Sequence, residues 1–559
     1  MRFIQRKKSM IPGMLCIAAL LWVLTGYILY PALKTVELSL TAKGVFSFSH
    51  YLKIFAADTS LNAIKNSIVL GGLSVVVCGV IGTALAFFVH YFEFPYKRIV
   101  DKLLLLPVML PGLIIVFSFV QLYGESGLIT KTVELILGLE RPLWNFSGLK
   151  GILFVHAYTQ YVYFYISVSI AIKHIDYSVV ESARNLGASK LKVLTSVIFP
   201  FITPALIASS VITFMSGIGS FTAPSIIGGR YRVLTTQILL SKANNYMAVA
   251  AAQAVILTVI SLFFFVVFRW YEKTKQFNVS VKSVLISPVK IENRFLKGLM
   301  LLVFGCLILT ILLPVASIVG LSFVKSGKWM VSIYPREFCF ENYKDILTRA
   351  RAFAPFFDSI LMALLASFVC LVIAVPSSYL IVKTKLKVKW IVEILTLLPW
   401  TMPASAIAIN MINAYNQPNL FAFNAVLVGT YLLLPLGYVI RSIPIMVKTA
   451  NISFQNLNNT YIEASKSLGA SSFQTFAKII VPIISPGLLA GFLLVFIRSI
   501  GEYTVSVFLY TASNKPVSIA MVNAIFEYNI GLAMAYGSLL IVVTAVLSLV
   551  ISRLSATVL

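Results

Sequence analysis

Apolar stretches of about 20 residues recur along the whole chain, and they constrain its fold more than any other feature. A helix of that length crosses the roughly 30 Å hydrocarbon core of a bilayer. We place six in each half, near residues 11–33, 61–89, 103–123, 151–172, 203–226, 247–268, 298–323, 359–382, 391–412, 421–440, 485–510 and 532–556. Of the 559 residues, 59% are hydrophobic and only 11% are charged, which excludes an ordinary soluble domain. The sequence predicts an all-α polytopic membrane protein with about 12 transmembrane helices.

Basic residues give the chain a formal net charge of +26, which in a soluble protein would suggest nucleic acid as a partner. With the N-terminus inside the cell, however, most Lys and Arg fall in cytoplasmic segments, as the positive-inside rule requires, although the basic outer loop 324–356 runs against it. We therefore expect the charge to serve the lipid bilayer and predict no nucleic-acid partner. The apolar run after Arg6-Lys7-Lys8 is too long for a signal peptide and lacks a small-residue cleavage site, so we expect an uncleaved first span.

A polar segment between the spans occurs twice. Residues 176–200 contain Glu181 and Gly187, and residues 458–482 contain Glu463 and Gly469, each 282 positions later without a gap. Six spans per half is an even number, which makes the halves parallel copies and disfavours an inverted-repeat transporter. We predict three parts: a first repeat over 1–270, a cytoplasmic basic linker over 271–297 and a second repeat over 298–559.

Two shorter motifs recur at a spacing of 292. The prolines Pro107 and Pro111 match Pro399 and Pro403, and Asn66-Ser67 matches Asp358-Ser359. Paired prolines in a membrane helix remove backbone hydrogen bonds and mark a bend that neighbouring helices must support. A kink that only shapes the helix bundle remains a sufficient explanation for them.

Apolar residues follow a helical period on both sides of Gly187 and of Gly469. A glycine between two such stretches is typical of a helix end that needs a left-handed residue. Each copy is therefore predicted to form two short helices joined at a fixed angle, projecting into the cytoplasm as a lever for a soluble partner. The alternative is an amphipathic loop resting on lipid headgroups.

Both segments resemble the EAA loop of permease subunits from binding-protein-dependent ABC importers of the type I, MetI-like class, although Ser182 stands where alanine is usual. The resemblance implies an ATPase-coupling role for Glu181, Gly187, Glu463 and Gly469. It further implies two copies of a cytoplasmic ABC ATPase, an extracytoplasmic substrate-binding protein or lipoprotein, and a place in the bacterial cytoplasmic (inner) membrane. Fused permeases of this kind are most often assigned to ferric iron.

Nucleotide chemistry is expected from a separate subunit, so the chain itself is not expected to be an enzyme. No G-x-x-x-x-G-K-[ST] motif occurs, and Ser326-Gly327-Lys328-Trp329 lacks both the upstream glycine and the final hydroxyl. No two histidines have metal-ligand spacing, so we expect neither a metal site nor a cofactor.

Ionisable residues inside the spans are rare and point to a candidate translocation path. Arg498 and Glu502 are four residues apart, which places them on one helix face where they can pair. They form either a structural ion pair or a gate or transit site for a charged substrate. The equivalent residues of the first half are Ser216 and Ser220. His156 belongs to a second polar patch, and a lone histidine there is more often an interface residue than a metal ligand.

The sequence thus predicts the transmembrane permease of an ATP-driven importer that receives its solute from an extracytoplasmic binding protein. Ferric iron is the expected cargo, with thiamine, a polyamine or an organophosphonate as alternatives. In a different class, an ATP-independent secondary transporter or channel would need coupling-ion carboxylates within the spans, and only Glu502 qualifies. A membrane-embedded enzyme is disfavoured because no nucleophile–base pair or metal cluster recurs at one depth.

Overall fold

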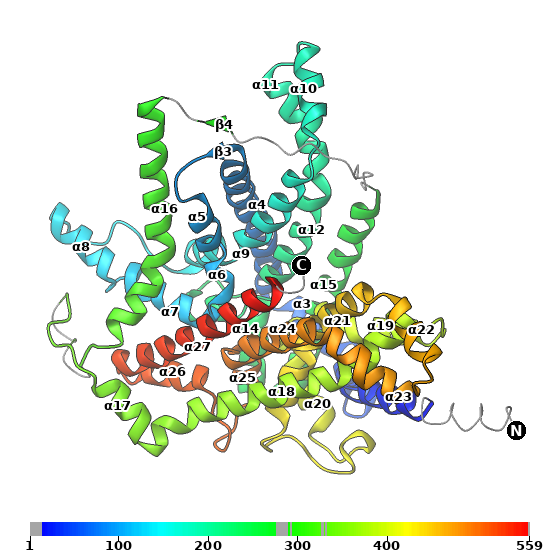
Figure 1. The fold of residues 1–559 in the computed structure, drawn as a ribbon. Coiled ribbons are helices and arrows are strands. Elements are labelled where there is room, and N and C mark those ends of the chain that lie inside the picture. The colour runs from blue at the N-terminus through cyan, green and yellow to red at the C-terminus, as the bar shows by residue number, and fades with distance from the viewer. Residues whose placement is uncertain (1–13, 275–288, 291–292, 326–328, 330–332, 557–559) are drawn as a thin grey trace, which may run out of the picture.

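The computed structural model describes residues 14–274, 289–290, 293–325, 329 and 333–556, and nearly all of them are helical (Figure 1). The N-terminal basic cluster and much of the predicted linker lie outside the described residues. Two pairs of very short strands occur in the described part: β1 (Thr41–Ala42) pairs antiparallel with β2 (Val45–Phe46), and β3 (Phe92–Glu93) pairs parallel with β4 (Val289–Lys290).

The helices of the two halves follow each other in the same order. The first half contains η1 (Thr25–Leu29), α2 (Tyr30–Ser39), α3 (Ser49–Ala56), α4 (Asp58–Tyr91), α5 (Lys97–Leu103), α6 (Leu106–Met109), α7 (Gly112–Tyr123), α8 (Leu128–Leu137), α9 (Gly148–Lys173), α10 (Tyr177–Asn185), α11 (Lys190–Val193), η2 (Leu194–Ile198), α12 (Phe199–Ile218), α13 (Thr222–Ile227), α14 (Leu234–Ala243) and α15 (Met247–Thr274). The second half contains α16 (Arg294–Leu321), α17 (Glu341–Thr348), α18 (Ala350–Lys383), α19 (Lys389–Leu397), η3 (Leu398–Trp400), α20 (Ala404–Tyr415), η4 (Leu420–Ala422), α21 (Leu433–Asn456), α22 (Asn459–Ser467), α23 (Ser472–Thr475), η5 (Phe476–Ile480), α24 (Val481–Ile500), α25 (Thr504–Leu509), α26 (Val517–Phe526) and α27 (Ile530–Ala556).

Within the described ranges, ten helices are long and apolar enough to cross a membrane. An eleventh span is the bent pair formed by Lys389–Trp400 and Ala404–Tyr415, which turns by 113° at Pro403 and its neighbours. The predicted fourth span corresponds to α9, whose tyrosines, His156 and Gln160 lower its mean hydropathy, but whose 26 residues reach about 39 Å. The twelve predicted segments therefore each have a helical counterpart.

The tenth predicted span was placed wrongly. It was expected at 421–440, whereas α21 covers Leu433–Asn456 and the preceding residues form turns around η4. This helix has the lowest hydropathy of the ten spans, and 72% of its most apolar window is buried, more than in any other. Because protein rather than lipid surrounds α21, it tolerates polar residues that a hydropathy pattern reads as the end of a span.

The two halves cross at a wide angle and exchange their first helices. Figure 1 shows α4 and α12 of the first half running upright, while α24 and α27 of the second half run across the view. The first-half helix α2 packs on α20, where the Tyr415 hydroxyl donates to the Gly26 carbonyl at 2.7 Å. Reciprocally, α16 packs on α7, where the Ser118 hydroxyl donates to the Pro314 carbonyl at 2.9 Å. The halves therefore share one core and cannot separate as two independent domains.

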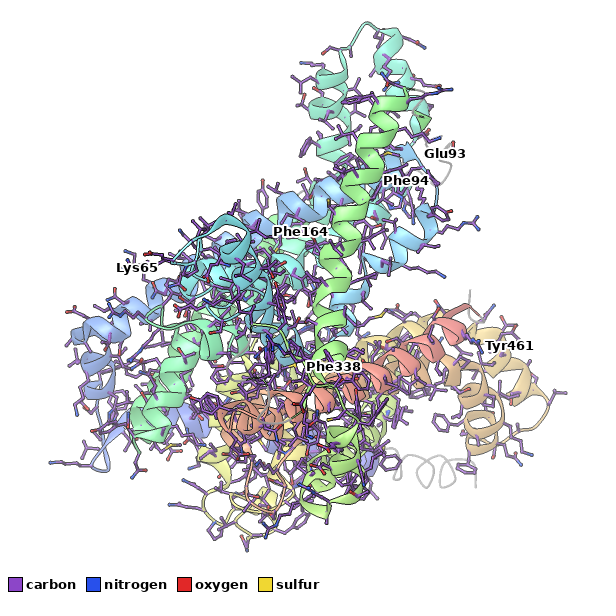
Figure 2. All side chains as sticks on the ribbon, turned by 90° about the vertical axis from the view of Figure 1, so that its left-hand side faces the viewer. Lys65, Glu93, Phe94, Phe164, Phe338 and Tyr461 are labelled. Carbon is purple, nitrogen blue, oxygen red and sulfur yellow. The ribbon has the colours of Figure 1, made fainter. Side chains whose placement is uncertain are left out.

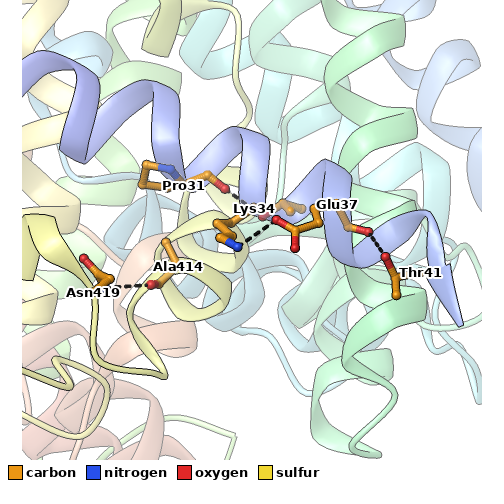
Figure 3. A network of polar contacts seen from close by, with 7 residues as sticks. Pro31, Lys34, Glu37, Thr41, Ala414 and Asn419 are labelled. Atoms are coloured by element: carbon orange, nitrogen blue, oxygen red, sulfur yellow. Dashed lines mark hydrogen bonds and ion pairs between the residues drawn. The ribbon is translucent and has the colours of Figure 1, made fainter. Parts of the chain in front are cut away.

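Figure 3 shows this exchanged helix from close by, with α2 beside the end of α20 and the following turn. Lys34 and Glu37 form an ion pair along α2 at 2.8 Å, and Asn419 donates to the Ala414 carbonyl at 3.0 Å. The Asn413 amide donates to the Thr35 hydroxyl at 3.2 Å and so ties the two segments together.

Short helices that follow α12 and α24 are anchored by the serines of the second recurring motif. The Ser67 hydroxyl accepts from the N–H of Leu234, the first residue of α14, at 2.7 Å. The Ser359 hydroxyl accepts from the N–H of Val517, the first residue of α26, at 2.8 Å. A buried helix end needs such a partner for its free N–H groups. The recurring serine thus fixes α14 on α4 and α26 on α18.

Candidate functional site

The two duplicated polar segments fold alike. In the first, α10 and α11 meet at Gly187, whose φ is +83°, and in the second α22 and α23 meet at Gly469, whose φ is +82°. At each glycine the helix closes with the same two backbone bonds: Gly187 N–H to the Arg184 carbonyl and Ala188 N–H to the Ala183 carbonyl, with Gly469 and Ala470 repeating them. A residue with a Cβ is strained at this φ. The predicted pair of short helices joined at glycine is therefore present in both halves.

Both segments project from the body on separate arms (Figures 1 and 2), and Figure 2 shows Tyr461 on the second arm. Glu181 and Glu463 are exposed. Three further equivalent pairs expose large apolar side chains, which are Val179 with Tyr461, Leu186 with Leu468, and Leu191 with Phe473. Leu186 and Leu468 are each 88% exposed. Val180 packs inward, whereas Leu186 lies exposed at the turn.

Each arm continues directly into a membrane helix. The first runs through the π-helical η2 into α12, and the second runs through the π-helical η5 into α24. Pro200 and Pro482 are the second residues of α12 and α24, so each continuous helix lacks one backbone N–H next to its π-helical turn. One continuous helical segment therefore runs from each arm to the far end of α12 or α24.

The far ends of α12 and α24 meet the paired prolines of the opposite half. A Cβ added to Gly501 would lie 2.6 Å from the Pro111 Cβ, and one added to Gly219 would lie 3.5 Å from the Pro403 Cβ. Gly219 and Gly501 are equivalent, as are Pro111 and Pro403, so the two contacts are related by the approximate symmetry of the halves. The second proline of each pair therefore does more than bend its own helix, because it contacts the other half.

One aromatic ring from each half packs across the boundary between the halves. Phe221 and Tyr503, which are equivalent residues, pack with ring centroids 5.8 Å apart, and both are buried. Each lies two residues after the glycine of its own half, Gly219 or Gly501. We call this ring contact the central seal.

Different polar groups hold the residues that follow α12 and α24 in the two halves. In the first half His156 is buried, with Nδ1 2.7 Å from the Ser74 hydroxyl and Nε2 2.9 Å from the Ser220 hydroxyl. Both ring nitrogens are therefore engaged in linking α9 to α4 and to the residue after α12. These contacts place His156 between helices of the first half, and its part in a translocation path stays a prediction. In the described residues no group of three or more His, Cys, Asp or Glu could hold a metal ion.

In the second half the expected Arg498–Glu502 pair is not formed. Glu502 instead makes an ion pair with Arg441 of α21, and its Oε1 also accepts from the Val505 N–H at 2.9 Å. Glu502 is only 7% exposed, whereas Arg498 is exposed and Ser216 is half-buried. The i,i+4 spacing permitted the predicted pair, but Glu502 lies beyond the end of α24, where the chain has turned toward α21.

Arg441 was missed because the tenth span was placed too early, which put this residue in the cytoplasm. The repeat spacing contained the missing signal: 282 positions before Arg441 lies Thr159, well inside the predicted fourth span. Matching the halves would have moved Arg441 into the membrane and given Glu502 a second candidate partner.

Comparison with known proteins settles the class to which these arms and helices belong. Residues 69–276 and 371–558 match the family described as "Binding-protein-dependent transport system inner membrane component". The chain belongs to this family. It is therefore an ABC transporter permease with two MetI-like repeats in one chain, and a multi-pass inner-membrane protein.

Relatives of this permease include proteins named for different cargoes. A probable ABC transporter permease, y4fN, of Sinorhizobium fredii is 27% identical over 97% of this chain and 96% of its own length. The ferric transport system permease FbpB of Actinobacillus pleuropneumoniae is 25% identical over 97% of this chain and 78% of its own. The spermidine/putrescine permease PotB of Escherichia coli K12 is 30% identical over 38% of this chain and 80% of its own.

Among solved structures, a bacterial ABC transporter that imports the acidic polysaccharide alginate has a chain that is 18% identical to this permease, with a TM-score of 0.40. The match covers 49% of this chain and 99% of that one.

Proposed function

We propose that this permease forms the translocation path of an ATP-driven importer and is moved by two cytoplasmic ATPase subunits, one on each arm. The observation that carries the proposal is the continuity of each arm with the helix that ends at the central seal. Each arm offers an exposed glutamate beside exposed apolar side chains, which suits docking into a complementary groove on another protein. The N-terminus and both arms are then cytoplasmic.

In this mechanism the described conformation is closed on the outside. Phe221, Tyr503 and the two glycine–proline contacts seal the ends of α12 and α24 that are farthest from the arms. ATP-driven approach of the arms rotates α12 and α24 and parts the seal, so that an extracytoplasmic binding protein can release its solute. ATP hydrolysis restores the seal.

Ferric iron is the cargo we propose, because the similarity to FbpB proteins extends over 97% and 92% of this chain. Thiamine, a polyamine or an organophosphonate is the alternative cargo for the same machinery. An ATP-independent transporter or channel is the alternative of another class, and transport by the chain alone in liposomes would favour it.

The test is the double variant Glu181→Ala, Glu463→Ala in cells that carry the complete transport system. We expect uptake and co-purification of the ATPase to be lost while the variant still accumulates in the membrane. Glu527→Ala, which removes a carboxylate at the end of α26, is the matched control and should leave both unchanged. Normal uptake and ATPase attachment in the double variant would refute the proposed role of the arms.

A further inference from the structure

Three cations of the second half have neutral counterparts in the first. They are Arg441, Lys448 and Arg498, and the residues 282 positions earlier are Thr159, Ile166 and Ser216. Arg441 and Lys448 are seven residues apart on α21, which places them on one face of that helix. All three lie within spans, where an uncompensated cation is costly. Cations in that position need either a partner or a wet cavity.

Arg498 lies close to charged and polar groups of both halves. It interacts electrostatically with Arg441, with Glu502 and, across the boundary of the halves, with Tyr163 of α9. Its side chain is exposed, whereas the next two residues of the helix, Ser499 and Ile500, are buried. Arg498 is also three residues before Gly501, which places it one helical turn to the arm side of the central seal.

The charge near Arg498 is not balanced. Glu502 is the carboxylate that acts on it, and that carboxylate is already held by the Arg441 guanidinium and the Val505 N–H. No carboxylate of the described residues lies within 4.0 Å of Arg498. Two guanidinium groups thus share one carboxylate, and the excess positive charge belongs to the accessible member. Lys448, also exposed, stacks its ammonium over Trp400 at 5.1 Å and adds no negative charge.

We propose that the path carries its cargo as an oxyanion, with Arg498 as the contact on the arm side of the seal. This inference rests on the proposed transport function and names its substrate class. An arginine donates two parallel N–H groups to carboxylate, phosphate or phosphonate oxygens, and does so best in a partly desolvated site. The oxyanion is either the cargo itself, such as a phosphonate, or the ligand of a ferric ion in a complex of net negative charge. The excess positive charge near Arg498 repels a polycation and therefore disfavours a polyamine as the cargo.

The first experiment measures the electrostatic potential near Arg498 directly, and it needs neither cargo nor ATPase. A cysteine is placed at Ser216, the first-half position equivalent to Arg498. The chain is full-length, and its five native cysteines are replaced. The chain is held in nanodiscs, and the cysteine is modified by methanethiosulfonates of equal reach, one carrying a sulfonate and the other a quaternary ammonium. We expect faster modification by the anionic reagent and a roughly tenfold fall in the anionic-to-cationic rate ratio in Arg498→Gln, because one nearby charge acts oppositely on the two reagents.

Arg553→Gln removes an exposed cation at the end of α27 and is the matched control, for which the ratio should not change. Equal rates for the two reagents in the parent chain, or an equal effect of Arg498→Gln and Arg553→Gln, would overturn the proposal. Neither outcome would bear on the ATPase-coupled function, which the Glu181 and Glu463 variants test separately.

The second experiment identifies the source of the oxyanion in cells with the complete system. Uptake of radiolabelled ferric citrate, 2-aminoethylphosphonate and putrescine is measured in parallel for the parent, Arg498→Gln and Arg498→Lys. We expect the parent to take up either ferric citrate or 2-aminoethylphosphonate. That uptake should fall at least tenfold in Arg498→Gln and be partly rescued in Arg498→Lys, while ATPase co-purification stays unchanged. Putrescine uptake that survives Arg498→Gln at the parent rate would contradict the inference.

Discussion

Replacing Gly501 by alanine tests whether the glycine–proline contacts hold the closed arrangement of the halves. The new Cβ would lie 2.6 Å from the Pro111 Cβ, whereas carbon atoms pack at about 3.5–4.0 Å. The proline ring cannot rotate out of the way, so α24 and the start of α7 must separate by about 1 Å. Overpacking of this kind costs about 1–3 kcal/mol, which shifts the closed state by about 5- to 150-fold against an open one.

The equivalent Gly219→Ala is the matched control, because its Cβ meets Pro403 at an ordinary 3.5 Å and its own helix, at the Met215 carbonyl, at 3.1 Å. We expect its cost to stay below about 1 kcal/mol. Thermal unfolding of the purified chain should therefore show a lower midpoint for Gly501→Ala than for Gly219→Ala, and a cysteine at Ser220 should become more accessible only in the former. Equal midpoints and equal accessibility in the two variants would refute the reasoning.

Three further sets of variants probe the remaining contacts. Arg441→Ala leaves Glu502 buried without its ion-pair partner and should destabilise the chain by about 3–5 kcal/mol, which lowers the thermal midpoint. Adding Glu502→Gln to the same chain should partly restore the midpoint. An unchanged midpoint in Arg441→Ala would show that the ion pair does not stabilise the fold. Gly187→Ala and Gly469→Ala should each destabilise the turn of an arm by about 1–2 kcal/mol and weaken ATPase co-purification. The control Gly298→Ala, which has open space at its Cβ, should leave co-purification unchanged. Full recovery of the ATPase with both arm variants would contradict the role of the turn. Ser67→Ala and Ser359→Ala each leave one buried helix N–H without a partner, which should lower the stability of the chain by about 1–3 kcal/mol in thermal unfolding. Ser210→Ala is the control that should change the midpoint least, because the Ser210 hydroxyl bonds only within its own helix.

Much of the architecture followed from local patterns. Apolar length located the spans, and exact spacing between the copies of Glu181 and Gly187 identified the repeat before any helix was known. The left-handed glycine in each arm was predictable because only one residue type adopts that backbone cheaply. These features depend on neighbours in sequence or on the bilayer, so they leave a local trace.

Contacts between distant helices left a weaker trace. Hydropathy misplaced α21 because that helix is surrounded by protein, and the error concealed Arg441 and hence the true partner of Glu502. The exchange of α2 and α16 between the halves depends on side chains such as Tyr415 and Ser118, whose partners are about 200 to 390 positions away. Period and composition carry no information on such partners.

The most direct test of the account asks whether movement of the arms opens the central seal. Phe221→Cys and Tyr503→Cys are introduced together into a chain otherwise free of cysteine, assembled with its ATPase in nanodiscs, and disulfide formation is measured with and without a non-hydrolysable ATP analogue. The account predicts efficient cross-linking without nucleotide and a large loss of cross-linking when the analogue is bound. A cross-linking yield that nucleotide does not change would contradict it.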